Sequence, residues 1–222
     1  MGTTVVGPQK PLEDPLAHLP RSAIWEYRKG QLIYNEDQPA NCIYLVINGI
    51  VKVSRLADGG HEVVLDLYRP DEFFGESAFL NPPRRSEQAT AVENTKLMMW
   101  TMAEIEGLVM NRPRLAVALL QILVQRTIDL THRIESFSVD SIARRLAHSL
   151  IRFSERLRKS GSDGSVLLVP LTHMLLSQYI GTSREIVTVY MNKFRRQGLL
   201  AYSRKGIILY RDALGEWLRQ NL

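Results

Sequence analysis

The sequence contains one cysteine, no long apolar run and only dispersed histidines, and each absence excludes a class of protein. Because Cys42 is alone, the chain forms no intrachain disulfide and cannot hold an iron–sulfur cluster through several of its own thiolates. The apolar neighbours Ile43 to Leu45 predict a buried strand cysteine rather than a reactive thiol. No uncharged apolar stretch is long enough to span a membrane, and residues 1–20 lack the pattern of an export signal. We therefore expect a cytoplasmic protein that does not cross a membrane.

The histidines give little support for an enzyme. They are His18, His61, His132, His148 and His173. A cupin-type metal enzyme, the main enzymatic alternative, needs several histidines and a carboxylate on neighbouring strands, but the sequence has no His-x-His pair. A haem protein needs a well-placed axial ligand, which this dispersed set does not indicate. We expect no metal site, no catalytic residues and no enzymatic activity.

The positive charge of the chain is concentrated at one end. Residues 140–222 contain 14 Lys and Arg against 6 Asp and Glu, a net charge of +8, whereas residues 1–139 contain 14 against 17, a net charge of −3. A basic surface confined to one region is typical of nucleic-acid binding, because phosphates attract it at long range. A solvated basic face is the alternative that charge alone leaves open.

The N-terminal half predicts a β-roll, that is, a jelly roll or double-stranded β-helix. From Tyr27 to about Leu97, short β-type runs are separated by turn residues, which is typical of such folds. Asn48-Gly49 between apolar runs predicts one hairpin, because both residues of its turn must accept positive φ. Asp58-Gly59-Gly60 predicts a second hairpin.

A long helix with a coiled-coil period follows the β region. Between Leu115 and Phe137, candidate seam residues recur at steps of three and four: Leu120, Leu123, Thr127, Leu130, Ile134 and Phe137. Such a seam predicts pairing with a second copy of the chain. Packing on the chain's own β domain is the alternative. A further helix is expected over residues 139–159, ending in a polar loop.

The C-terminal region predicts two short helices joined by a tight turn. Thr172 caps the first helix, which ends at Ile180, and Gly181 forms the turn. Thr182 and Glu185 have capping-box spacing, so the second helix begins near residue 183 and runs to about 197. Its predicted inner face is Val187, Tyr190, Met191 and Phe194.

The opposite face of the second helix predicts a surface for DNA. Its exposed residues are Arg184, Glu185, Thr188, Val189, Asn192 and Arg196. A polar and basic helix after such a turn can enter the major groove. Residues 199–202 and 207–210 predict a two-stranded wing whose turn carries Arg204 and Lys205. A small helical subdomain with a solvated basic face is the alternative.

In this order of elements the chain resembles the CRP/FNR family, the cyclic-AMP receptor protein and its relatives. The resemblance covers residues 24–210. Its most specific segment is Ile180-Gly181-Thr182-Ser183-Arg184-Glu185-Ile186-Val187, and a second is Phe73-Phe74-Gly75-Glu76 followed by Arg85-Ser86. The expected α+β organisation is a tail over residues 1–20, a β-roll sensor over 21–110, a dimerisation helix over 111–138 and a winged helix-turn-helix over 139–222.

The resemblance implies a transcription regulator that binds a pseudo-palindromic operator as a homodimer. Base reading is expected from Arg184, Glu185, Thr188 and Val189. Phosphate contacts are expected from Thr172, Ser183, Asn192, Lys193, Arg195, Arg196, Arg204 and Lys205. Val189 stands where the family usually has arginine, so we expect it to touch a thymine methyl or to be silent. Residues 159–165 resemble by position a loop through which family activators touch RNA polymerase, with a plain solvent loop as the alternative.

The resemblance also implies an effector pocket in the roll. Its expected residues are Gly75, Glu76, Ser77, Arg85, Ser86, Leu130 and Thr131. A glutamate, an arginine and backbone amides of this kind can hold the ribose and phosphate of cAMP or cGMP. Two departures stand against a cyclic nucleotide: Glu87 follows Ser86, and Leu130 replaces a hydroxyl residue. The alternatives are another small effector, or a constitutive regulator in which Glu76 pairs with Arg85 and closes the roll.

Overall fold

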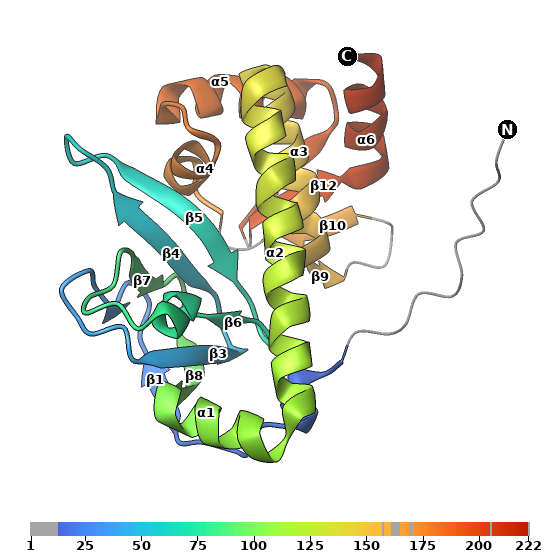
Figure 1. The fold of residues 1–222 in the computed structure, drawn as a ribbon. Helices are drawn as coiled ribbons and strands as arrows, with labels where there is room; N and C mark the ends of the chain where they lie inside the picture. Colours follow the sequence, from blue (N-terminus) through green and yellow to red (C-terminus); the bar gives the residue numbers. More distant parts are fainter. Residues whose placement is uncertain (1–12, 157, 161–164, 169–170, 205, 222) are drawn as a thin grey trace, which may run out of the picture.

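The computed structural model describes residues 13–156, 158–160, 165–168, 171–204 and 206–221. A β-roll forms one end, a long helix runs along one side, and a smaller α+β unit covers the other end of that helix (Figure 1). This arrangement confirms the predicted fold class.

The β-roll consists of two four-stranded antiparallel sheets, ordered β1-β8-β3-β6 and β2-β7-β4-β5. Its strands are β1 Ile24–Tyr27, β2 Leu32–Tyr34, β3 Cys42–Asn48, β4 Val51–Leu56, β5 Glu62–Tyr68, β6 Phe73–Phe74, β7 Gln88–Ala91 and β8 Thr95–Thr101. Two 3-10 helices, η1 Pro15–Ala17 and η2 Glu76–Leu80, accompany them. An aromatic cluster fills one part of the interior, with Tyr44 and Phe74 stacked at a centroid distance of 5.0 Å. Cys42 is buried in this strand framework, as predicted.

Of the two predicted hairpins, one is confirmed and one is wrong. Strands β4 and β5 pair around Asp58-Gly59-Gly60, with Leu56 opposite Glu62. Asn48-Gly49, in contrast, connects β3 in one sheet to β4 in the other. A Cβ on Gly49 would lie 2.7 Å from the Asn94 carbonyl oxygen, and the φ of Gly49 is +93°. The glycine is therefore required by a close crossing between sheets, which a local turn pattern does not distinguish from a hairpin.

Three helices connect the roll to the C-terminal unit: α1 Met102–Asn111, α2 Pro113–Val139 and α3 Ile142–Arg156. Thr101 and Glu104 form a reciprocal capping box at the start of α1. The helix predicted over 139–159 is shorter than expected. It ends at Arg156, and the chain enters strand β9, Arg158–Ser160, which pairs with β10, Ser165–Leu168.

The C-terminal unit places a helix pair on a four-stranded sheet ordered β11-β12-β10-β9. Its remaining elements are α4 His173–Ile180, α5 Arg184–Arg196, β11 Leu200–Ser203, β12 Gly206–Tyr210 and α6 Arg211–Gln220. The predicted two-stranded wing is therefore one half of a larger sheet. Leu150 and Phe153 of α3 are fully buried in the same core as Phe194 of α5, so α3 holds the helix pair in place.

Charged side chains fasten this unit to the roll. Arg156 of α3 donates to Asp66 at 2.8 Å and to Glu72 at 2.9 Å. Although burial lowers the pKa of Arg156, the two carboxylates outweigh burial and hold the pKa above its ordinary value. Gln178 of α4 donates to Glu62 of β5 at 2.9 Å. The position of the helix pair is therefore set by contacts with β5 as well as by its own core.

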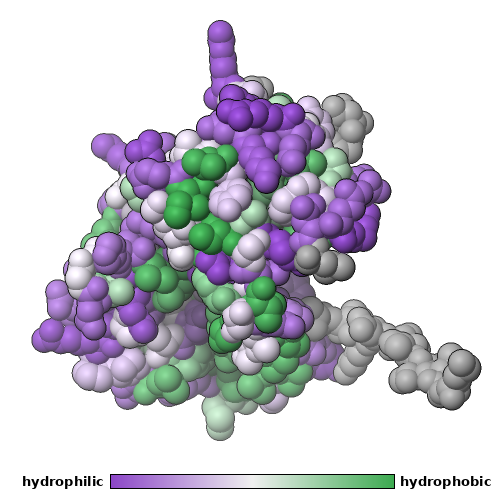
Figure 2. Space-filling view, turned by 90° about the horizontal axis from the view of Figure 1, so that it is seen from above, coloured by the Kyte–Doolittle hydropathy of each residue, from purple (hydrophilic) through white to green (hydrophobic). Residues whose placement is uncertain are grey.

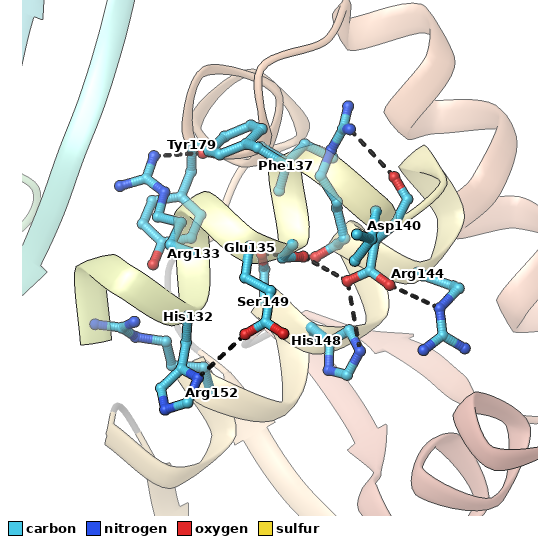
Figure 3. Close-up of a pocket in the computed structure, with 14 residues that line it drawn as sticks. His132, Arg133, Glu135, Phe137, Asp140, Arg144, His148, Ser149, Arg152 and Tyr179 are labelled. Carbon is cyan, nitrogen blue, oxygen red and sulfur yellow. Dashed lines mark hydrogen bonds and ion pairs between the residues drawn. The ribbon is translucent and has the colours of Figure 1, made fainter. Parts of the chain in front are cut away.

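The elbow between α2 and α3 is fixed by Asp140 (Figure 3). Its carboxylate accepts from Ser136 at 2.6 Å and from Arg144 at 2.8 Å, and His148 lies 3.7 Å away. Burial raises the pKa of the Asp140 carboxyl, but these hydrogen bonds together outweigh it and hold the pKa below the ordinary 3.8. The ionised form is therefore the one that stabilises the elbow.

We expect Asp140→Asn to lower the free energy of unfolding by about 1–2 kcal/mol at neutral pH, because charge-assisted hydrogen bonds are lost. Since the folded pKa is depressed, this contribution is present above pH 3.8 and is lost as the pH falls through the folded pKa. Urea unfolding of both proteins over a pH series measures it. A stability difference that persists unchanged in acid would contradict this role of the carboxylate.

Candidate DNA-reading surface and roll cavity

The turn between α4 and α5 depends on Thr172, Gly181 and Ser183. Thr172 caps α4 by accepting from the Leu175 amide at 3.1 Å. Gly181 has a φ of +71°, and a Cβ there would lie 3.1 Å from Cε1 of Phe137 in α2. Glycine is therefore needed both for the left-handed turn and for the close approach of α2.

The cap of α5 differs from the prediction. Ser183, rather than Thr182, accepts from the Ile186 amide and is the N-cap. The observed helix, Arg184–Arg196, still agrees closely with the predicted range of about 183–197. The Ser183 hydroxyl is adjacent to the predicted cap and can accept from the same first-turn amides. Val187, Met191 and Phe194 of the predicted inner face are fully buried, and Phe194 packs edge-on against Trp217 of α6.

The outer face of α5 points away from the core. Arg184, Glu185 and Val189 are exposed, and the Val189 side chain is 64% accessible. Thr188 and Asn192 are half-buried, whereas Lys193, Arg195 and Arg196 are exposed. Figure 2, seen from this end of the molecule, shows mainly hydrophilic side chains around a small apolar group. The candidate base-reading and phosphate-contacting residues of α5 thus share one face.

A hydrogen-bonded chain behind this face was not predicted. His173 of α4 lies 2.8 Å from the Thr188 hydroxyl and 2.8 Å from the Tyr202 hydroxyl. Thr188 donates to the Arg184 carbonyl at 2.9 Å, so its oxygen accepts from Nδ1–H and Nε2 accepts from Tyr202. Burial, with a smaller effect of Arg184, lowers the pKa of His173 below 6.5. The neutral ring therefore joins α4, α5 and β11.

The turn of the wing and the segment before β10 are only partly described. Arg204 is exposed beside the close pairing of Ser203 with Gly206. Lys205 lies outside the described residues. Of the proposed polymerase-contacting segment 159–165, residues 161–164 also lie outside them, while the ends belong to β9 and β10.

An exposed apolar stripe runs along α2. From the predicted seam, Leu120, Leu130, Ile134 and Phe137 are exposed, as is Thr127. Leu123 is only half-exposed and lines a crevice on the roll side. Val117, Val124 and Ile128, which the seam omits, are exposed. The difference arises because an α-helix of 3.6 residues per turn drifts away from a strict 3.5-residue seam.

A cavity of about 360 Å³ lies between the roll, α2 and α3. Of the predicted effector residues, Gly75, Glu76, Ser77 and Leu130 line it. Arg85 is buried behind this lining and donates to the Gly75 carbonyl at 3.2 Å, whereas Ser86 is exposed but donates its hydroxyl to Glu87 of the lining at 2.8 Å. Thr131 is absent from the lining and donates to the Thr127 carbonyl. The structure thus gathers part of the predicted pocket and separates the rest.

The predicted pairing of Glu76 with Arg85 is wrong. Glu76 instead pairs with Arg126 of α2 at 2.7 Å, and Arg126 also lies over the Tyr68 ring. Arg85 faces Glu87, with 3.8 Å between its Nη1 and a carboxylate oxygen. Arg126 was missed because nothing in the sequence connects a helical arginine with a glutamate fifty positions earlier.

The described part of the chain contains no group of three His, Cys, Asp or Glu side chains arranged to hold a metal ion. Within the same residues, no helix is long and apolar enough to cross a membrane.

A helix pair with a wing, joined through a long helix to a hollow β-roll, defines a class of protein: DNA-binding regulators that carry a sensor-type domain. The family models agree with this assignment. Residues 24–112 match the cyclic nucleotide-binding domain, and residues 144–217 match the Crp-like helix-turn-helix domain. Together these matches span more than half of the chain. The protein belongs to the CRP/FNR family of transcription regulators.

Similar proteins cover nearly the same length. A CRP-like cAMP-activated global transcriptional regulator of Mycobacterium tuberculosis is 24% identical, over 83% of this chain and 82% of its own. A cyclic AMP receptor protein of Thermus thermophilus is 29% identical, over 78% and 77%. A solved transcriptional regulator of the CRP/FNR family, also from Thermus thermophilus, superposes with a TM-score of 0.73 at 26% identity, over 89% and 98%.

We expect His173→Ala to weaken operator binding about fivefold. The variant loses the hydrogen bonds to Thr188 and Tyr202 that position α5, and this loss should reduce the binding free energy by roughly 1 kcal/mol. The protein should remain folded. His61→Ala is the control, since His61 is exposed in the roll hairpin. Fluorescence anisotropy with labelled operator measures both variants. Equal affinities for the two would contradict a positioning role for His173.

Proposed function

We propose that the protein binds a pseudo-palindromic operator as a homodimer, with α5 of each copy in the major groove. The supporting observation is the division of α5 into two faces. Val187, Met191 and Phe194 are fully buried on the inner face, with Tyr190 half-buried beside them, whereas the exposed face carries Arg184, Glu185 and Val189. A helix held rigidly by one face can present the other to base edges. Because operator DNA lies in the cytoplasm, we propose that the protein acts there. No catalytic role is proposed.

A second copy of the chain is the proposed partner of the apolar stripe on α2. Ile134 is 65% accessible and Leu120 is 60% accessible, which is unfavourable for a helix left in water. Pairing of two such helices around a two-fold axis buries the stripe. Phe137 lies at the Gly181 turn, so the same pairing would fix the separation of the two reading helices.

Base reading is assigned to four residues with different chemistry. Arg184 donates to guanine O6 and N7, and Glu185 accepts from cytosine N4. Val189 offers only a methyl surface, which suits a thymine methyl. Thr188, whose hydroxyl is engaged by His173 and the Arg184 carbonyl, contributes its methyl group. The preferred half-site should therefore lack a guanine requirement opposite Val189.

Phosphate contacts are assigned to the surrounding polar and basic residues. They are Thr172, Ser183, Asn192, Lys193, Arg195, Arg196, Arg204 and Lys205. Because each neutralised phosphate releases counterions, affinity should fall steeply with salt. The segment 159–165 is proposed as the contact with RNA polymerase, with an unpartnered solvent loop as the alternative.

Control is assigned to the roll cavity. Its wall combines Glu76 of the roll with Arg126 and Leu130 of α2, so a bound molecule would touch the proposed dimer helix directly. A cyclic nucleotide, cAMP or cGMP, or another small effector is proposed, by analogy with the relatives named above. A cyclic nucleotide would have to share the roll with Glu87, which already faces Arg85. A constitutive dimer is the second candidate.

Arg184→Ala should relax base preference, with a loss of about 1–3 kcal/mol confined to the cognate operator. Lys193→Ala is the matched control on the same helix and should weaken all sequences alike. Competition assays with operators carrying single base-pair changes separate the two effects. The assignment fails if both variants alter specificity equally, or if neither does.

Ile134→Glu should convert the dimer into a monomer, because two carboxylates would meet in an apolar seam. Leu56→Glu is the control, since Leu56 is also apolar and exposed but lies in the roll hairpin. Sedimentation velocity reports the mass of each variant. A wild-type protein that sediments as a monomer at micromolar concentration would refute the proposed assembly.

A further inference from the structure

Two hydroxyl donors and one guanidinium surround the buried carboxylate of Glu87 in the roll. The Ser77 hydroxyl donates to one oxygen at 2.7 Å, and the Ser86 hydroxyl donates to the other at 2.8 Å. The Arg85 guanidinium lies 3.8 Å from the same carboxylate. Glu87 is 7% accessible and Arg85 is 4% accessible. The two carboxylate oxygens are thus surrounded by one cation and two hydroxyl groups. Such groups are typical of a site that binds an oxyanion.

The donors of this site are fixed by contacts that do not involve Glu87. Arg85 donates to the Cys42 carbonyl at 2.5 Å and to the Gly75 carbonyl at 3.2 Å. Its guanidinium lies 4.0 Å from the centre of the Tyr34 ring. Removing the carboxylate would therefore leave the arginine in the same position.

The second hydroxyl is supported from the other side. Arg55 of β4 donates to the Ser86 hydroxyl at 3.0 Å and to the Ser86 carbonyl at 2.7 Å. The loop that carries Ser86 is thus held against the roll by a second cation. A preformed site with a buried guanidinium strongly favours a negative charge, because an unpaired buried cation is costly.

Among the described residues that line the neighbouring cavity, no second cation is free to bind an anion. Each of its three arginines already has partners: Arg126 pairs with Glu76, Arg152 pairs with Asp129, and Arg133 donates to backbone carbonyls. Arg85 is the arginine whose negative partner is Glu87.

We propose that Glu87 is a resident anion, which fills an oxyanion site built from Arg85, Ser77 and Ser86. The native protein then takes no phosphate of a nucleotide at this place, and removal of the carboxylate opens a site for one. This inference rests on the proposed function and narrows it: of the effectors named there, it excludes cAMP and cGMP and leaves another small effector. Any effector of the native protein binds the remaining cavity without an anionic group at Arg85.

The test is a gain of binding in Glu87→Ala. Isothermal titration with cAMP, cGMP and inorganic phosphate should give no detectable binding to the wild type. The variant should bind them at least tenfold more tightly than the weakest binding that the wild-type titration could detect. Thermal unfolding should show a lowered midpoint that these anions raise again. The double variant Arg85→Ala/Glu87→Ala should bind none of them, because the cation is gone.

Glu87→Gln is the matched control, since it keeps the shape of the side chain and removes its charge. It should be destabilised without gaining anion binding, because the amide still fills the site. Glu87→Ser serves in place of the alanine variant if circular dichroism shows that the latter is unfolded. Wild-type binding of a cyclic nucleotide as tight as that of the variant would overturn the proposal, as would folded alanine and serine variants that bind no anion.

Operator binding by the same proteins keeps this inference separate from the proposed function. If the wild type does not bind an operator but Glu87→Ala gains anion binding, the proposed regulator mechanism is refuted and the inference about Glu87 stands. Normal operator binding without any gain of anion binding would refute only the resident anion.

Discussion

The arrangement of the molecule depends on the guanidinium of Arg133. From α2 it donates to the carbonyls of Val64 and Leu65 in the roll and to the carbonyl of Tyr179 in α4. It also lies 4.0 Å from the centre of the Tyr179 ring. Burial lowers the pKa of Arg133, but an arginine still carries its charge at neutral pH. One cation thus joins the roll, the long helix and the helix pair. A movement of α2 must therefore either break these hydrogen bonds or move the roll and the helix pair with it.

The same helix serves three surfaces. Its exposed stripe is the proposed dimer contact, Arg126 and Leu130 face the roll cavity, and Phe137 closes on the Gly181 turn. A second cavity of about 450 Å³ lies at the elbow, lined by Phe137, Asp140 and Arg145 among others (Figure 3). A rotation of α2 would therefore alter the cavity wall, the proposed dimer contact and the contact of Phe137 with the Gly181 turn at the same time. A two-state switch requires such coupling.

Features set by local chemistry could be predicted from the sequence. The α4–turn–α5 unit was found because Thr172, Gly181 and the apolar period of α5 each have local causes. The Asn48-Gly49 hairpin failed because an inter-sheet crossing uses the same residues as a local turn. The pairing of Glu76 was predicted wrongly and the chain through His173 was missed, because their partners, Arg126, Thr188 and Tyr202, come from distant segments. Such contacts follow from packing, which no spacing reveals.

Selection of random DNA by the native protein tests the reading helix and the two-fold assembly together, because enrichment of an inverted repeat requires both. We expect enrichment of two inverted half-sites whose centres lie about one helical turn apart, roughly 10–10.5 base pairs. Enrichment of a single unpaired half-site, or of no sequence at all beyond salt-dependent bulk binding, would contradict it.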